Sequence, residues 1–320
     1  MVALVRGIER KPFTMLIYAV AGIGKSSLAA AFPNSIVLGP ENNEELNALK
    51  FPRTKTFEDF SNRLKEIENG VYQKEGIKTL VLDSIDMTEG LIHQSILRTE
   101  PGKTMVSARG GFGKAFKESW IKLEGIRDSL ERIREKQKLN IVIVGHSVKI
   151  KFTDPMLGVE YDTYEMCLHK SQKNDANSIF IDWVSNVFFM NWRAFKAEDG
   201  KFAVGTDTRV LYTQYRPSHI AKNRFNMPFE IELQDTQDHT VNAGIILDYI
   251  EQFYSNGGLV NQDSQNSNQL GMLQHEVKNL VSQIKGQDQL QKMQEYYNQN
   301  ENNYENLMWM KGRVSEILNS

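Results

Sequence analysis

The 320-residue chain has a single cysteine, Cys167, and no apolar run long enough to span a membrane. One cysteine excludes an intrachain disulfide framework and suits a reducing cytoplasm. His169 lies close by, but without a second Cys/His pair at ligand spacing a zinc site is not expected. The first residues also lack the charged and then apolar pattern of a secretory signal. We therefore expect a cytoplasmic protein without membrane contact.

An excess of charge of either sign is also missing, because the net charge is only −2. This balance excludes a protein that coats nucleic acid through general basicity, so any DNA affinity must come from a local patch. With 40% hydrophobic and 24% charged residues, the composition is that of an ordinary soluble globular protein. The length allows one large domain with an appendage, or two domains.

Against these absences stands one distinctive motif, Ala-Val-Ala-Gly-Ile-Gly-Lys-Ser-Ser, at residues 19–27. An apolar run of strand length, 13–18, precedes it, and a helix pattern, 28–32, follows it. This order of strand, tight loop and helix is typical of a phosphate-binding loop, whose main-chain N–H groups turn towards a phosphate. The predicted nucleotide-binding residues are Ala21, Gly22, Ile23, Gly24, Lys25, Ser26 and Ser27.

Within this motif, Lys25 is predicted to reach the β- and γ-phosphates of ATP, and the Ser26 hydroxyl to ligate Mg²⁺. The first glycine of the pattern G-x-x-x-x-G-K-[ST] is replaced by Ala19, which can make the same bend if its φ stays negative. The alternative is a glycine-rich turn that binds nothing. The Lys-Ser pair and the flanking elements favour nucleotide binding.

Residues 1–256 have the pattern of alternating strands and helices. Apolar strands separated by helices predict an α/β fold with a mainly parallel sheet covered on both faces. Strands are expected at 35–38, 79–83, 140–144, 186–190, 209–212 and 229–233, and helices at 57–67 and 115–137. Residues 257–271, rich in Asn, Gln, Ser and Gly, predict a linker. Residues 272–320 have helical apolar spacing and predict a small helical hairpin or bundle.

Three polar residues stand at predicted strand ends, where catalytic groups would be needed. Asp83 is predicted to hold the Mg²⁺ shell, although it could instead cap the next helix. Glu41 is the best placed acid to orient a water on the γ-phosphate; Glu44 is the reserve, and a solvated acidic loop is the alternative. His146 can touch the γ-phosphate, or be an ordinary hydrogen-bonded histidine at a strand end.

These pieces, in this order, resemble the RecA core, and most closely the phage ATPases of RecA fold known as Sak-type single-strand annealing recombinases. Besides the phosphate-binding loop, three segments carry the resemblance. They are Leu-Val-Leu-Asp-Ser at 80–84, Gly-Phe-Gly-Lys at 111–114 leading to Ile-Val-Gly-His at 143–146, and Ala-Lys-Asn-Arg-Phe-Asn-Met-Pro-Phe at 221–229. The resemblance implies a RecA-like P-loop NTPase core.

The resemblance also implies a role for the basic pair of the last segment, Lys222 and Arg224. In that family this pair reaches the nucleotide site of the neighbouring subunit, so the protein is expected to be a homo-oligomer with nucleotide at its interfaces. A cation supplied across an interface stabilises charge on the γ-phosphoryl group. Judged on residue type alone, two exposed basic residues beside a strand would be the simpler interpretation.

RecA-type proteins hold single-stranded DNA through two mobile loops, which correspond here to residues 99–114 and 147–178. The implied DNA-binding residues are Arg109, Lys114, Lys149 and Lys151. Cations follow the phosphates, and interspersed aromatic side chains stack on bases. Residues 100–151 hold twelve Lys or Arg against six Asp or Glu, although part of this excess lies on a predicted helix and can be a solvated face. Acidic residues also dilute the charge of the second loop.

The leading expectation is a DNA-dependent ATPase, using ATP and Mg²⁺, that binds single-stranded DNA and promotes annealing or homologous recombination. It would serve a phage or prophage in the cytoplasm of a bacterial host, with a single-strand binding protein as a further partner. One alternative is an ATP-driven helicase or helicase loader of RecA fold. Another is a nucleotide-gated interaction protein with little hydrolysis. No separate amino-terminal oligomerisation helix is expected, which leaves a ring or a ligand-driven assembly open beside a filament.

Overall fold

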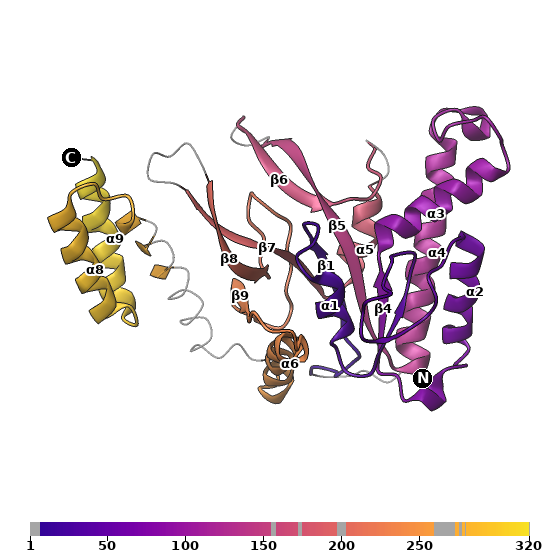
Figure 1. Cartoon of the computed structure of the whole chain (residues 1–320), viewed down its shortest axis with the longest axis horizontal. Coiled ribbons are helices and arrows are strands. Elements are labelled where there is room, and N and C mark those ends of the chain that lie inside the picture. Colours follow the sequence, from indigo (N-terminus) through magenta and orange to yellow (C-terminus); the bar gives the residue numbers. More distant parts are fainter. Residues whose placement is uncertain are drawn as a thin grey trace.

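The structure is a computed structural model and describes residues 7–154, 158–171, 175–196, 203–258, 273–274, 277–278 and 280–319. In these residues the centre of the molecule is a nine-stranded sheet (Figure 1). Eight strands lie in the order β3 (Leu49–Lys50), β2 (Ser35–Leu38), β4 (Thr79–Asp83), β5 (Asn140–Thr153), β1 (Thr14–Ala19), β7 (Asn186–Lys196), β8 (Ala203–Tyr212) and β9 (Glu230–Leu233). The ninth, β6 (Glu160–Met166), pairs with β5 outside this path.

Parallel pairing runs through the sheet from β3 to β7. The remaining pairs, β5 with β6, β7 with β8 and β8 with β9, are antiparallel. Parallel neighbours bring their carboxyl ends to one edge of the sheet, so the loops that follow β1, β2, β4 and β5 meet there. The predicted α/β fold with a mainly parallel sheet is confirmed.

Helices cover both faces of the sheet (Figure 1). One face carries α2 (Phe57–Glu68), α3 (Ile85–Arg98), α4 (Lys114–Gln137) and α5 (Ala176–Trp183), and the other carries α1 (Lys25–Ala30) and α6 (Thr240–Ser255). Successive β1 side chains alternate between the two cores: Leu16 packs into the first, and Met15 and Ile17 into the second. Burial on both faces explains why this strand reads as an unbroken apolar run.

The second predicted DNA-binding loop, 147–178, is not a loop along its whole length, and that expectation is wrong in this respect. Strand β5 continues nine residues past the predicted end, Val144, and pairs with β6 in an antiparallel ribbon from Ser147–Met166 to Thr153–Glu160. Figure 1 shows this β5–β6 ribbon projecting from the body of the sheet. Apolar residues and lysines alternate along residues 148–152 of β5, which is the pattern of a strand with two different faces.

Two other parts of the chain bear on the expectations. Helices α8 (Gln287–Asn300) and α9 (Tyr304–Asn319) confirm the predicted carboxy-terminal helices, and they share an apolar cluster of their own. Most of the predicted linker, 259–271, lies outside the described residues, so the division into domains stays a prediction. Among the described residues, no helix has both the length and the apolar character needed to cross a bilayer.

Close contact between the end of β4 and the residue after β2 requires a glycine at position 39. A Cβ on Gly39 would lie 1.8 Å from the carbonyl oxygen of Asp83, which is main chain and cannot swing away. The main-chain N–H of Glu41 donates to this same carbonyl at 3.2 Å. The glycine therefore lets the segment after β2 lie directly against the end of β4.

We predict that Gly39→Ala lowers the free energy of unfolding by about 1–3 kcal/mol, because the methyl group overpacks a backbone contact. The matched control is Gly90→Ala in α3, where an added Cβ would meet no atom within 4 Å. There the change should raise stability by about 0.5–1 kcal/mol, the usual gain for alanine over glycine in a helix. Urea unfolding of both variants tests this, and equal stability of Gly39→Ala and the wild type would contradict it.

Candidate nucleotide-binding site

The predicted phosphate-binding loop lies between the end of β1 and the start of α1. Gly22 and Gly24 have φ of 74° and 96°, in the left-handed region where glycine is favoured, and α1 begins at Lys25. Ala19 ends β1 as a paired strand residue and does not have a positive φ. The replacement of the usual first glycine is therefore tolerated, as the sequence suggested.

A buried ionic group lies beside this loop, at the end of β4. Asp83 and Lys25 are both buried, and Oδ2 of Asp83 accepts a hydrogen bond from Nδ2 of Asn43 at 3.1 Å. Burial raises the pKa of Asp83, while the Ser26 hydroxyl, the Asn43 amide and the positive charge of Lys25 act in the opposite direction. Ser84, not Asp83, is the N-cap residue of α3, so the helix-cap alternative for Asp83 is excluded.

The group around Asp83 suits a magnesium ion held with a nucleotide. Oδ1 of Asp83 is buried and accepts no hydrogen bond from any residue that the structure describes. No cluster of three or more His, Cys, Asp or Glu able to hold a metal occurs among the described residues. A hydroxyl and a single carboxylate are nevertheless enough for Mg²⁺, which takes its other ligands from phosphates and water. Ser26 and Asp83 therefore fit the predicted metal role.

At the same sheet edge, His146 lies between two carboxylates. Its Nδ1 is 2.9 Å from Oδ2 of Asp86, its main-chain N–H donates to Oδ1 of Asp86 at 3.0 Å, and its Nε2 is 3.7 Å from Oε1 of Glu41. The hydrogen bond that the His146 ring donates to the carboxylate of Asp86 raises the pKa of His146. Burial acts to raise the pKa of Asp86, but the hydrogen bonds and charge of His146 prevail and lower it.

The structure thus brings together five of the residues predicted from the sequence: Lys25, Ser26, Glu41, Asp83 and His146. Glu41, rather than Glu44, contacts His146. Sequence reasoning missed Asp86 and Asn43, although both follow predicted strand ends by a few residues. Their nearness to the strand ends could be predicted from the sequence, but their contacts could not.

A polar cleft of about 1040 Å³ opens next to α1. Its walls come from the start of α1, from the loop after β2 and from the turn before α6, including Ser26, Ser27, Glu41, Asn43 and His239. The cleft therefore continues from the phosphate-binding loop and has room for the rest of a nucleotide.

The predicted basic pair, Lys222 and Arg224, lies near the amino-terminal ends of the parallel strands, opposite the end that carries the phosphate-binding loop. Lys222 pairs with Val187 near the start of β7, and the N–H of Arg224 donates to the side chain of Asn186. Since Asn186 is level with Met15 at the start of β1, the pair is displaced from the phosphate loop by roughly 13 Å along the strand direction. Within one chain, neither side chain is therefore positioned to contact a nucleotide at the phosphate-binding loop.

The two members of this pair differ in their surroundings. The ammonium group of Lys222 donates to the carbonyl of Ile181 near the end of α5, and burial lowers its pKa. Arg224 is exposed, and among the described residues no carboxylate forms an ion pair with it. Arg224 is thus the member available to a neighbouring molecule.

The predicted DNA-binding lysines of the β5–β6 ribbon have acidic partners. Lys149 pairs with Asp162 at 3.0 Å and Lys151 with Glu160 at 2.8 Å, across the two strands. Both lysine side chains are well exposed, at 60% and 72%. The ribbon face that carries them is therefore close to neutral.

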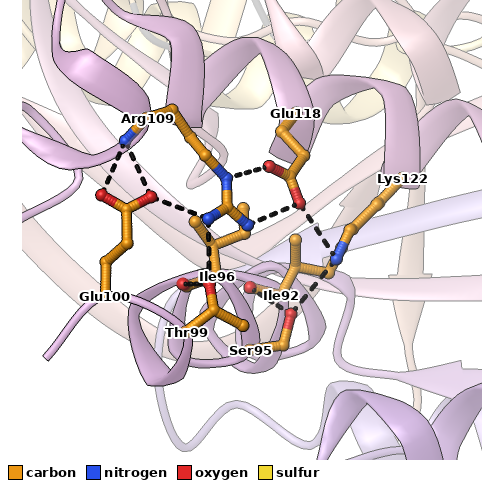
Figure 2. Close-up of polar contacts among 8 residues, drawn as sticks. All are labelled: Ile92, Ser95, Ile96, Thr99, Glu100, Arg109, Glu118 and Lys122. Carbon is orange, nitrogen blue, oxygen red and sulfur yellow. Dashed lines mark hydrogen bonds and ion pairs between the residues drawn. The ribbon is translucent and has the colours of Figure 1, made fainter.

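Arg109 forms ion pairs with two carboxylates, where each ribbon lysine has one (Figure 2). Its Nε lies 2.6 Å from Oε2 of Glu118 and its Nη1 lies 2.7 Å from Oε1 of Glu100, while its own main-chain N–H also donates to Glu100. Glu118 in turn pairs with Lys122 at 3.4 Å. The guanidinium group thus binds the segment before α4 to the helix itself, and its charge is already balanced.

The same segment presents two other side chains to solvent. Phe112 is 98% exposed in a run of glycines with positive φ. Lys114, at the start of α4, is exposed and has no ion-pair partner among the residues described. Of the four predicted DNA-binding residues, Lys114 alone therefore has an unbalanced charge within the described part of the chain.

A mainly parallel α/β sheet with a glycine-rich loop between β1 and α1, and an acidic residue at the end of β4, defines the class of P-loop nucleotide-binding proteins. Residues 11–225 match the family AAA_24, described as an AAA domain. The match covers more than half of the chain, so the protein belongs to this family of AAA-type P-loop ATPases. Membership implies nucleotide binding, usually with Mg²⁺, and ATPase activity in general. No curated protein sequence matches the chain.

We predict that Asp86→Asn destabilises the protein more at pH 5.5 than at pH 8.5. The raised pKa of His146 means that its pair with Asp86 stabilises the folded state fully below the unfolded histidine pKa of about 6.5, and that this contribution is lost as the pH rises through the folded value. Asp86, whose pKa is lowered, stays ionised throughout this range. Thermal unfolding at both pH values measures the difference.

The control for this prediction is Asp128→Asn, which removes an exposed carboxylate that pairs with Arg127 on the surface of α4. It should shift the melting temperature little, and equally at the two pH values. A loss in Asp86→Asn that is equal at both pH values, or larger at pH 8.5, would show that the His146 pair contributes no pH-dependent stability.

Proposed function

We propose that the protein is a DNA-dependent ATPase of the Sak-type single-strand annealing recombinases, acting in phage or prophage recombination. The observation that carries the ATPase part is the group of Lys25, Ser26, Asp83, Glu41 and His146 at one sheet edge. Lys25 and Mg²⁺ held near Ser26 and Asp83 would bind the phosphates, and Mg²⁺ would neutralise charge that develops on them. Glu41 would orient the attacking water, with His146 beside it.

Support for single-stranded DNA as the partner comes from the segment before α4 and from the ribbon. Phe112 offers an exposed ring for a base, and Lys114 nearby offers a charge for the phosphates. On the ribbon, Phe152 and Tyr161 lie together, with ring centroids 5.5 Å apart. Because the ribbon lysines are paired with acids, we propose that the ribbon contributes mainly aromatic contacts and that Lys114 supplies charge.

Arg224 is proposed to act on the nucleotide of a neighbouring subunit. Its position near the amino-terminal end of β7 separates it from the phosphate loop of its own chain, and its guanidinium is exposed. A homo-oligomer that brings this edge of one subunit to the phosphate loop of the next would supply a cation to the γ-phosphoryl group. Lys222, whose ammonium is engaged by α5, would position the segment.

The experiment that tests the proposed function measures ATP turnover of the full chain with and without single-stranded DNA, and annealing of complementary oligonucleotides. We expect DNA to stimulate turnover. Lys114→Ala should weaken DNA binding and reduce its salt dependence by about one phosphate contact, because a counterion-releasing charge is lost. Lys149→Ala, the matched control in which the lysine is paired with Asp162, should change both quantities less.

Other outcomes identify the alternatives. Strand unwinding or translocation without annealing would favour a helicase or helicase loader. Nucleotide binding with negligible turnover, even with DNA, would favour a nucleotide-gated interaction protein. Turnover that DNA leaves unchanged, together with no annealing, would contradict the proposed function.

We predict that Lys25→Ala and Arg224→Ala are each nearly inactive alone but regain part of the activity when mixed. In a mixed oligomer, some interfaces combine the intact phosphate loop of an Arg224→Ala subunit with the intact Arg224 of a Lys25→Ala subunit. Turnover of the mixture, measured against each variant alone, is the test. The control mixture contains Lys25→Ala with Lys25→Gln, which cannot restore any site. If the test mixture is as inactive as its components, Arg224 does not act in trans.

A further inference from the structure

Strand β8, which is separated from β1 by β7, places an arginine close to the phosphate-binding loop. In the pairing of β7 with β8, Arg209 lies opposite Trp192, two residues beyond Met190, which is the β1-facing partner of Ala19. Arg209 therefore stands just past the carboxyl end of β1, where the phosphate loop begins. Its Nη1 is 3.2 Å from the position that a Cβ on Gly24 would occupy.

The charge of Arg209 is poorly balanced for its burial. The side chain is only 10% exposed, and Nη2 donates to the carbonyl of Gln234 at 3.0 Å. Among the residues that the structure describes, its one acidic partner is Asp235, at 3.4 Å and with a fully exposed side chain, and an ion pair with an exposed carboxylate contributes little. Within the described residues Nη1 has no hydrogen-bond partner. A buried cation in this state is stabilised by an anion.

The other titratable groups described near Arg209 do not supply that anion. His239 lies on the same side, with its Cε1 4.0 Å from the same point beside Gly24, and burial together with the charge of Arg209 lowers its pKa. The carboxylate of Asp238 is already engaged, because the N–H and hydroxyl of Thr240 donate to it at the start of α6. The space between Arg209 and Gly24 thus faces donors and a neutral ring.

We propose that Arg209 is a phosphate-binding residue of the nucleotide site, acting within its own chain on the terminal phosphates. This inference rests on the proposed function, and it adds a cation distinct from Arg224. The carbonyl of Gln234 fixes the orientation of the guanidinium, so that Nη1 points towards the loop. A preoriented guanidinium forms strong, charge-assisted hydrogen bonds with phosphate oxygens.

Arg209 could instead only brace the turn at Gln234 and Asp235 against the phosphate loop. The two roles differ in whether they need the charge of the side chain. A bracing residue acts through its bond to Gln234 and needs no charge, whereas a residue that contacts the terminal phosphates needs a cation. The comparison of Arg209→Gln with Arg209→Lys therefore separates the two roles.

The test is calorimetric titration of the full chain with ATP, ADP and AMP in the presence of Mg²⁺. Arg209→Ala should weaken ATP binding about tenfold or more, as expected for loss of a charged hydrogen bond, weaken ADP binding less and leave AMP binding unchanged. Arg209→Lys should recover part of the ATP affinity. Arg209→Gln, which can keep the bond to Gln234 but has no charge, should behave like Arg209→Ala.

The matched control is Arg193→Ala on the neighbouring strand β7, where the arginine is bound to Glu230 and Glu232. It should leave the ratio of ATP to AMP affinity unchanged. Equal ATP binding by Arg209→Gln and the wild type would overturn the inference and leave the proposed function intact. A loss in Arg209→Ala that Arg209→Gln restores as fully as Arg209→Lys would assign Arg209 the bracing role instead. Absence of nucleotide binding by the wild type would overturn the proposed function and this inference together.

Discussion

The carboxylate of Asp83, buried beside the ammonium of Lys25, is the interaction on which the rest of the site depends. Both groups are almost wholly removed from water, and burial alone would favour the uncharged acid. Lys25 and Ser26, at the start of α1, and Asn43, in the loop after β2, offset part of this effect. The close approach of Gly39 to the Asp83 carbonyl holds one of these loops in place. The phosphate loop, the end of β4 and the segment after β2 must therefore assemble together.

Helix α3 connects this sheet edge to the base of the ribbon. One turn apart on the helix, Asp86 binds His146, and the carboxylate of Glu89 accepts the main-chain N–H of His169 at 2.9 Å. Burial raises the pKa of Glu89 to about 7. The carbonyl of His146 also accepts the N–H of Cys167, just after β6. His146 is thus in direct contact with Glu41 at this sheet edge, with α3 and with the segment that continues from the ribbon.

Local charge balance changes how the basic stretch of the sequence is understood. Counting residues gives a clear cationic excess over 100–151. In the structure, however, Arg109 is enclosed by two glutamates and the ribbon lysines face acids across the strands. In the part of the chain that the structure describes, the features left to suit a polyanion are exposed rings and a few cations without an ion-pair partner, of which Lys114 is the clearest. A count of charged residues does not show which of them form ion pairs.

The sequence by itself determined the α/β class, the phosphate-binding loop, most parallel strands and the carboxylate at the end of β4, because each depends on a short local pattern. Apolar runs of strand length and glycines before Lys25 specify their structure without help from distant residues. Only the tertiary structure decided that Asp86 pairs with His146, that residues 147–166 fold into a ribbon, and that Arg209 reaches Gly24. The contacts of Asp86 with His146 and of Arg209 with Gly24 join remote parts of the chain, and they form only when the sheet has set the order and register of its strands.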